Sequence, residues 1–141
     1  MDISTIAEYL RQQVLMSEKY IDKNPEISNH FLIAATLDKR GRVIAIGENS
    51  IKTHPIMKHY GGRLRLKHKI HLHAEMSALV RSQRKVHGII VIRVSRNQGN
   101  LTMAKPCPIC QAAIDDAGIK NIYYSDRDGD IVSLIRLKED I

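Results

Sequence analysis

The stretch HAEMSALVRSQRKVHGIIVIRV, residues 73–94, contains the pattern that decides the fold. Residues 74–84 predict a helix. Gly88 to Val94 predict a strand, because the short apolar run Ile89 to Ile92 within this segment is typical of a buried strand. A helix that leads directly into such a strand indicates an α/β protein.

The segments on either side supply the other elements that we expect. Two helices and two pairs of strands follow from apolar spacing and turn residues: a helix over residues 4–20 with Thr5 and Glu8 as its capping box, a strand over 31–37 with a hairpin partner at 43–46, a helix over 107–117, and a last hairpin of 122–125 with 131–135. The order α-β-β-α-β-α-β-β predicts a three-layer α/β/α sandwich around a mixed five-stranded sheet, in a single domain of residues 1–141.

The composition is that of a soluble globular protein. It is 43% hydrophobic and 26% charged, which excludes collagen, coiled coil and wholesale disorder. The longest apolar runs, such as Ile89 to Ile92, are far shorter than the ~20 residues of a membrane span. Acidic residues precede any apolar run, unlike in a signal peptide. We therefore expect a cytoplasmic protein with no membrane partner.

Basic residues are concentrated in the middle of the chain. The net charge is +7, and between Ser50 and Ile114 the only acidic residue is Glu75. This bias favours an anionic partner, meaning phosphate, nucleotide or polynucleotide, and the alternative is a solvated surface that aids solubility. The long basic segment from Gly47 to Leu72 is expected to be a functional loop.

The chemistry of the chain is concentrated in two short motifs, His73-Ala74-Glu75 and Pro106-Cys107-Pro108-Ile109-Cys110. A C-x-x-C pair is typical of a redox motif or a metal site. At the start of a helix, both sulfurs point to one spot, and the helix N-terminus favours their thiolate forms. Two thiolates supply half of a tetrahedral zinc shell. With no second C-x-x-C present, His73 is the expected third ligand, and the fourth position is open to water as in catalytic zinc sites.

Glu75 follows the histidine by two residues, near the metal without ligating it. Zinc lowers the pKa of a bound water towards ~7, and a nearby carboxylate can accept that proton and pass it to a leaving nitrogen. The pattern H-x-E…P-C-x-x-C is the signature of zinc-dependent base deaminases. The alternative is a core histidine with an incidental cysteine pair, which leaves the prolines and Glu75 unexplained.

On these motifs the chain resembles the cytidine and deoxycytidylate deaminase superfamily, over roughly residues 30–125. The run from Cys110 to Tyr124 is similar to the family's third helix and fourth strand, and Gly47-Glu48-Asn49 is similar to its G-x-N motif. The resemblance implies a set of roles: zinc binding by His73, Cys107 and Cys110, proton transfer by Glu75, a hydrogen bond from Asn49 to the sugar or its replacement, one from the Ala74 N–H to the base carbonyl, and one from the base amino group to the Pro106 carbonyl.

Two further residues follow Asn49 closely enough to reach the same pocket. Lys52 and His54 are therefore expected to bind substrate, the alternative being that both lie on plain surface. The resemblance also implies a homo-oligomer, since members of the superfamily commonly complete each active site from a neighbouring subunit.

The expected function is zinc-dependent hydrolytic deamination of a cytosine-type nucleotide or nucleoside, with release of ammonia. Pro108 is similar to the deoxycytidylate, tRNA-adenosine and guanine deaminase branches, whereas the final hairpin differs from them. Two alternatives stay open. One is a deaminase that acts on a base within single-stranded nucleic acid, of the tRNA-adenosine or cytosine editing type. The other is a non-catalytic binding module stabilised by zinc.

Overall fold

In the computed structural model, the helices of the chain pack on a mixed sheet. The structure describes residues 2–22, 31–49, 73–96 and 98–134. The elements in chain order are α1 (Ile3–Leu15), α2 (Glu18–Asp22), β1 (Phe31–Leu37), β2 (Val43–Glu48), α4 (Ala74–Arg81), β3 (Gly88–Val94), β4 (Leu101–Thr102), α5 (Pro108–Asp116), β5 (Asn121–Ser125) and β6 (Ile131–Ser133). The strand order is β2-β1-β3-β5-β6, with β4 paired to β3 off this path. β3 and β5 are parallel, and the other described pairs are antiparallel.

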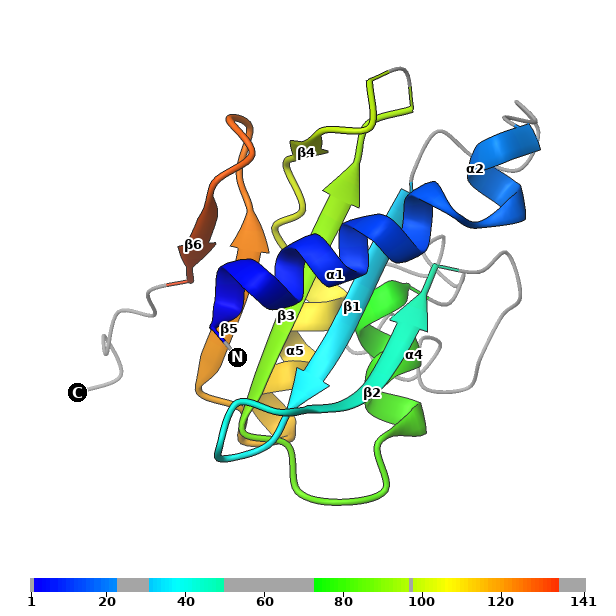
Figure 1. Cartoon of the computed structure of the whole chain (residues 1–141). Helices are drawn as coiled ribbons and strands as arrows, with labels where there is room; N and C mark the ends of the chain where they lie inside the picture. The colour runs from blue at the N-terminus through cyan, green and yellow to red at the C-terminus, as the bar shows by residue number, and fades with distance from the viewer. Residues whose placement is uncertain (1, 23–30, 50–72, 97, 135–141) are drawn as a thin grey trace.

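Helices cover both faces of the sheet (Figure 1). α1 packs its apolar side on one face, where Leu10 lies in a cluster with Ile33 and Ile92. The opposite side chains of the same two strands, Ala34 and Val91, pack towards α4. β3 is buried almost throughout because both of its faces are covered. The predicted three-layer α/β/α sandwich on a mixed sheet is confirmed.

The five predicted strands are all present, and a two-residue strand, β4, adds to them. The last two strands form the predicted hairpin, in which β5 pairs antiparallel with β6. In its turn, the Asp126 carboxylate accepts the backbone N–H groups of Asp128 and Asp130. The predicted end of the hairpin, Ile135, lies outside the described residues.

The helix expected over residues 4–20 is two helices, because Ser17 interrupts it. The Ser17 hydroxyl donates to the Val14 carbonyl at 2.6 Å and accepts the Tyr20 N–H at 3.4 Å. Such bonds between a serine side chain and the backbone compete with the helical ladder. Ser17 therefore ends α1 and caps α2.

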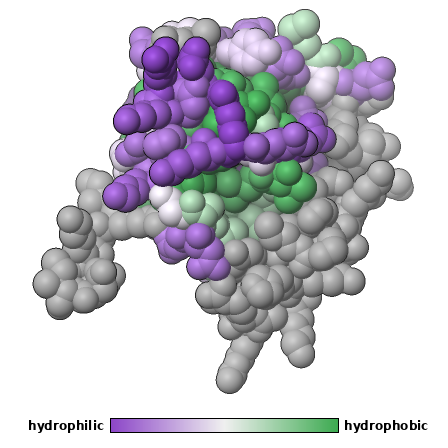
Figure 2. Space-filling view, turned by 90° about the horizontal axis from the view of Figure 1, so that it is seen from below, coloured by the Kyte–Doolittle hydropathy of each residue, from purple (hydrophilic) through white to green (hydrophobic). Residues whose placement is uncertain are grey.

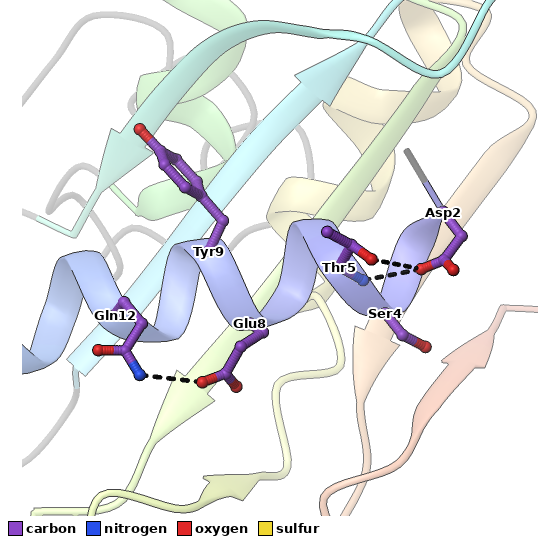
Figure 3. Close-up of a pocket in the computed structure, with 6 residues that line it drawn as sticks. All are labelled: Asp2, Ser4, Thr5, Glu8, Tyr9 and Gln12. Atoms are coloured by element: carbon purple, nitrogen blue, oxygen red, sulfur yellow. Dashed lines mark hydrogen bonds between the residues drawn. The ribbon is translucent and has the colours of Figure 1, made fainter.

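The predicted capping box at the start of α1 is wrong. Asp2 is the N-cap, and its carboxylate accepts both the backbone N–H and the hydroxyl of Thr5, at 2.8 and 3.0 Å (Figure 3). Glu8 instead accepts hydrogen bonds from the Arg11 and Gln12 side chains. The first N–H groups of the helix need an acceptor, and the Asp2 carboxylate provides it in place of the predicted Thr5 hydroxyl.

α4 ends three residues earlier than predicted, at Arg81 rather than Arg84, because Ser82 bonds to the sheet. Ser82 has extended backbone angles. Its hydroxyl donates to the Ala78 carbonyl at 2.8 Å and lies 2.6 Å from the hydroxyl of Thr36 in β1. This contact anchors the C-terminal end of α4 on the sheet. All helices within the described ranges are too short or too polar to cross a bilayer.

Candidate metal centre

Three side chains converge where α4 and α5 begin. His73 is the N-cap residue of α4 and Cys107 is the N-cap residue of α5, while Cys110 lies in the first turn of α5. His73 Nδ1 is 3.4 Å from the sulfur of Cys107 and 3.4 Å from the sulfur of Cys110. The three donor atoms all lie within 4.8 Å of one another. The structure thus brings together the three residues that the sequence predicts as metal ligands.

The spacing of these donors fits zinc. Bonds of about 2.3 Å to sulfur and about 2.0–2.1 Å to nitrogen, at tetrahedral angles, hold the two ligand atoms about 3.5 Å apart. The observed separations of 3.4 Å match this value. One imidazole and two thiolates form a donor set that zinc prefers, and three protein ligands leave the fourth position for water or substrate. His73, Cys107 and Cys110 are positioned to bind zinc.

The two thiols differ in acidity because they hydrogen-bond to each other. The pKa of Cys107 is lowered to about 4, first by the hydrogen bond from the Cys110 side chain and then by one from His73 and by the Cys110 backbone N–H. The pKa of Cys110 is raised well above its usual range by the same bond and by burial. Cys107 is therefore ready to bind metal as a thiolate, and Cys110 releases a proton when it becomes a second thiolate ligand.

Glu75, in the first turn of α4, is buried beside these ligands. Only 4% of its surface is exposed, whereas an ordinary first-turn acid points to solvent. Burial raises the pKa of its carboxyl group, and hydrogen bonds from its own backbone N–H and from Cys110 offset part of that rise. A buried carboxylate with a raised pKa is suited to accept and return a proton near neutral pH.

β2 holds α4 in close contact at Gly47. A Cβ atom at this position would lie 2.3 Å from the Ala78 nitrogen and 2.7 Å from the Ala74 carbonyl oxygen. Only glycine allows the helix to lie directly on the strand. The Arg81 guanidinium, at the C-terminal end of α4, donates to the Ile46 carbonyl at 3.3 Å, and the next residue, Gly47, lies against Ala78 and Ala74. β2 therefore runs towards the N-terminal end of α4. In the sequence, Gly47 is part of the predicted G-x-N motif, and no local pattern around it indicates this packing role.

The predicted substrate residues lie at the same end of the sheet, as far as the structure describes them. Asn49 follows β2, where its side-chain oxygen accepts the Leu32 N–H at 3.3 Å. Ala74 is fully buried and opens α4, where backbone N–H groups have no partner within the helix. Lys52 and His54 lie outside the described residues.

Pro106 immediately precedes Cys107, the N-cap residue of α5, and it is buried. Its carbonyl, predicted to accept from the substrate amino group, accepts the Gln111 side-chain amide at 2.7 Å. Sequence reasoning missed Gln111, because nothing in the motif P-C-P-I-C marks the residue after it as a partner of the first proline.

Two other polar features lie apart from this centre. Asp126, Asp128 and Asp130 are close enough to one another to share a cation, but Asp126 already bonds the turn of the β5–β6 hairpin. A shallow hollow on the outer side of α1 is lined by Asp2, Thr5, Glu8, Tyr9 and others (Figure 3). That hollow lies on the opposite layer of the fold from α4, so it is no part of the metal centre.

Comparison with known proteins agrees with this geometry. The family model for the cytidine and deoxycytidylate deaminase zinc-binding region matches residues 5–126. The matched range contains the three metal ligands and Glu75, and it begins earlier than the resemblance read from the motifs alone. No curated protein matches the chain.

Proposed function

The chain belongs to the cytidine and deoxycytidylate deaminase family, and we propose that it deaminates a cytosine-type nucleotide or nucleoside, releasing ammonia. The observation that carries this proposal is the burial of Glu75 beside a three-ligand centre. A structural zinc site takes four protein ligands and has no use for a buried acid next to them. The arrangement therefore favours catalysis over a binding module stabilised by zinc.

In the proposed reaction, water supplies the oxygen that replaces the amino group of the base. Zinc held by His73, Cys107 and Cys110 would lower the pKa of a water molecule, and so would supply the nucleophile near neutral pH. Glu75 passes one proton of the attacking water to the ring nitrogen of the base and the second to the amino group, so that the C–N bond breaks and the nitrogen leaves as ammonia. The Ala74 N–H and the Pro106 carbonyl orient the two sides of the base, and Asn49 orients the sugar or its replacement.

A second candidate is deamination of a base within single-stranded nucleic acid, which a basic surface favours. This surface consists of exposed side chains from the β1–β2 turn and from the end of α4 onwards, namely Lys39, Arg40, Arg42, Arg81, Arg84 and Lys85. In Figure 2, which views the molecule from this end, hydrophilic side chains lie across the core.

Asp38, the acidic residue of the β1–β2 turn, already pairs with two of these cations. The Arg42 and Arg84 guanidiniums lie 3.1 and 3.3 Å from the same Asp38 oxygen. The pKa of Asp38 is lowered, first by the Arg42 backbone N–H, so the carboxylate stays ionised. A phosphate backbone is the partner that such an excess of cations attracts. The basic surface lies about 12 Å from the metal centre, at the other end of α4, so a single-stranded nucleic acid would have to extend along the whole of that helix.

An ammonia-release screen distinguishes the two candidates. Zinc-loaded protein is assayed with cytosine, its nucleosides and monophosphates, and short single-stranded oligonucleotides, at two salt concentrations. Release from monomeric cytosine compounds that changes little with salt supports the proposal. Release from oligonucleotides alone, falling steeply with salt and with a Lys39→Ala/Lys85→Ala variant, supports the second candidate. Folded, zinc-loaded protein that releases ammonia from none of these substrates refutes both.

A further inference from the structure

The Gln111 side chain folds back over the first turn of α5. Its Nε2 donates to the Pro106 carbonyl oxygen at 2.7 Å, while its backbone N–H donates to the Cys107 carbonyl at 2.9 Å. The backbone bond is part of the normal helical ladder. The side-chain bond reaches the peptide unit before the helix, which no helical N–H group satisfies. Gln111 thus connects the body of α5 to the peptide that joins Pro106 to a metal ligand.

Two prolines restrict the backbone angles on either side of the peptide that joins Pro106 to Cys107. The ring of Pro106 fixes its own φ angle, and Pro108 restricts the preceding residue to extended conformations. Cys107 has such a conformation, with φ −71° and ψ 166°. The remaining variable is the direction of the Pro106 carbonyl, and the bond from Gln111 sets it.

A carbonyl held in this way can still accept a second hydrogen bond. Its oxygen has two lone pairs, and the Gln111 amide occupies one of them. The other can accept an N–H of the exocyclic amino group of a substrate base. The deaminated product has an oxygen acceptor at that position, so a fixed Pro106 carbonyl would bind the substrate and oppose the product.

We propose that Gln111 is a positioning residue: it aims the Pro106 carbonyl at the amino group that leaves, and so makes the site selective for aminated bases over their deaminated forms. The inference rests on the proposed function, because it requires a base with an exocyclic amino group as substrate. It adds to that function a residue that touches neither the metal nor the base.

The test replaces Gln111 with methionine, which keeps the length of the side chain and removes the donor. The ligands are a cytosine nucleoside and the matching pyrimidinone nucleoside, which has hydrogen in place of the amino group. For Gln111→Met, KM for the aminated substrate is expected to rise about tenfold, the effect of one hydrogen bond. The inhibition constant of the pyrimidinone should stay within about twofold. Gln111→Lys, which restores a donor, should recover most of the loss.

Two further measurements separate this role from a merely structural one. Zinc content and melting temperature should match those of the wild type and of Gln83→Met, a control at an exposed glutamine after α4. Equal weakening of both ligands, or no change in either, would overturn the role of Gln111 and leave the proposed function intact. Wild-type protein that deaminates no cytosine compound would overturn the proposed function, and the inference with it.

Discussion

Replacing Gly47 with alanine tests how the sheet holds the helix that carries Glu75, the proposed proton-transfer group. The new Cβ would lie 2.3 Å from the Ala78 nitrogen, whereas ordinary van der Waals contact begins at 3.4 Å. The contacted atoms are backbone atoms of α4 and cannot rotate away, so the helix must move by about 1 Å. Overpacking of this kind costs about 1–3 kcal/mol. Because Glu75 moves with the helix, turnover is expected to fall about 100-fold.

Urea unfolding of the zinc-loaded protein measures the free energy of unfolding, and ammonia release measures turnover. Gly118→Ala is the matched control, since its φ is +74° but its added Cβ meets no atom within 4 Å. That variant should lose about 1–2 kcal/mol through its left-handed backbone and keep its turnover. Wild-type turnover in Gly47→Ala, with stability unchanged to within about 0.5 kcal/mol, would refute the close contact between β2 and α4.

Two further predictions concern the ligands and the first helix. Elemental analysis after dialysis should find about one zinc per wild-type chain and little zinc in the Cys107→Ser variant. Full zinc content in that variant would exclude the Cys107 thiolate as a ligand. Asp2→Ala should lower the melting temperature while Asp2→Asn should not, because asparagine is an equally good N-cap; an equal loss in both would contradict the capping role. The hydrogen bond from the Thr5 N–H lowers the pKa of the Asp2 carboxyl group below its ordinary value of 3.8. The stabilisation that the ionised Asp2 gives to the folded protein should therefore be present at neutral pH. It should be lost as the pH falls below 3.8 and through the lower pKa of the folded state.

The sheet and its layers could be predicted because the evidence for them is local. β1 and β3 are short segments of mainly apolar residues, and such segments are typical of strands covered on both faces. Helix ends could not be predicted as well, since they depend on tertiary contacts. Ser82 ends α4 through the hydroxyl of Thr36, which is 46 positions earlier in the chain.

The positions of the metal ligands and of Glu75 in the fold were predictable for a similar reason. Each motif occupies the start of one helix, where spacing alone places its side chains together. Gly47 and Gln111 act through contacts that no spacing reveals. Gly47 allows α4, from a later part of the chain, to lie close to β2. Gln111 donates to the Pro106 carbonyl, whose direction depends on the folded backbone.

The rate of ammonia release by zinc-loaded Glu75→Gln protein tests the central claim most directly. The variant keeps the size of the side chain and the metal ligands, so it should hold zinc as the wild type does and fold normally. Because the proposed reaction uses Glu75 in more than one proton transfer, the rate of the variant on the best cytosine substrate is expected to fall about 10⁴-fold. A rate within about tenfold of the wild type, at full zinc content, would contradict the assignment of Glu75 as the proton-transfer group of a zinc deaminase.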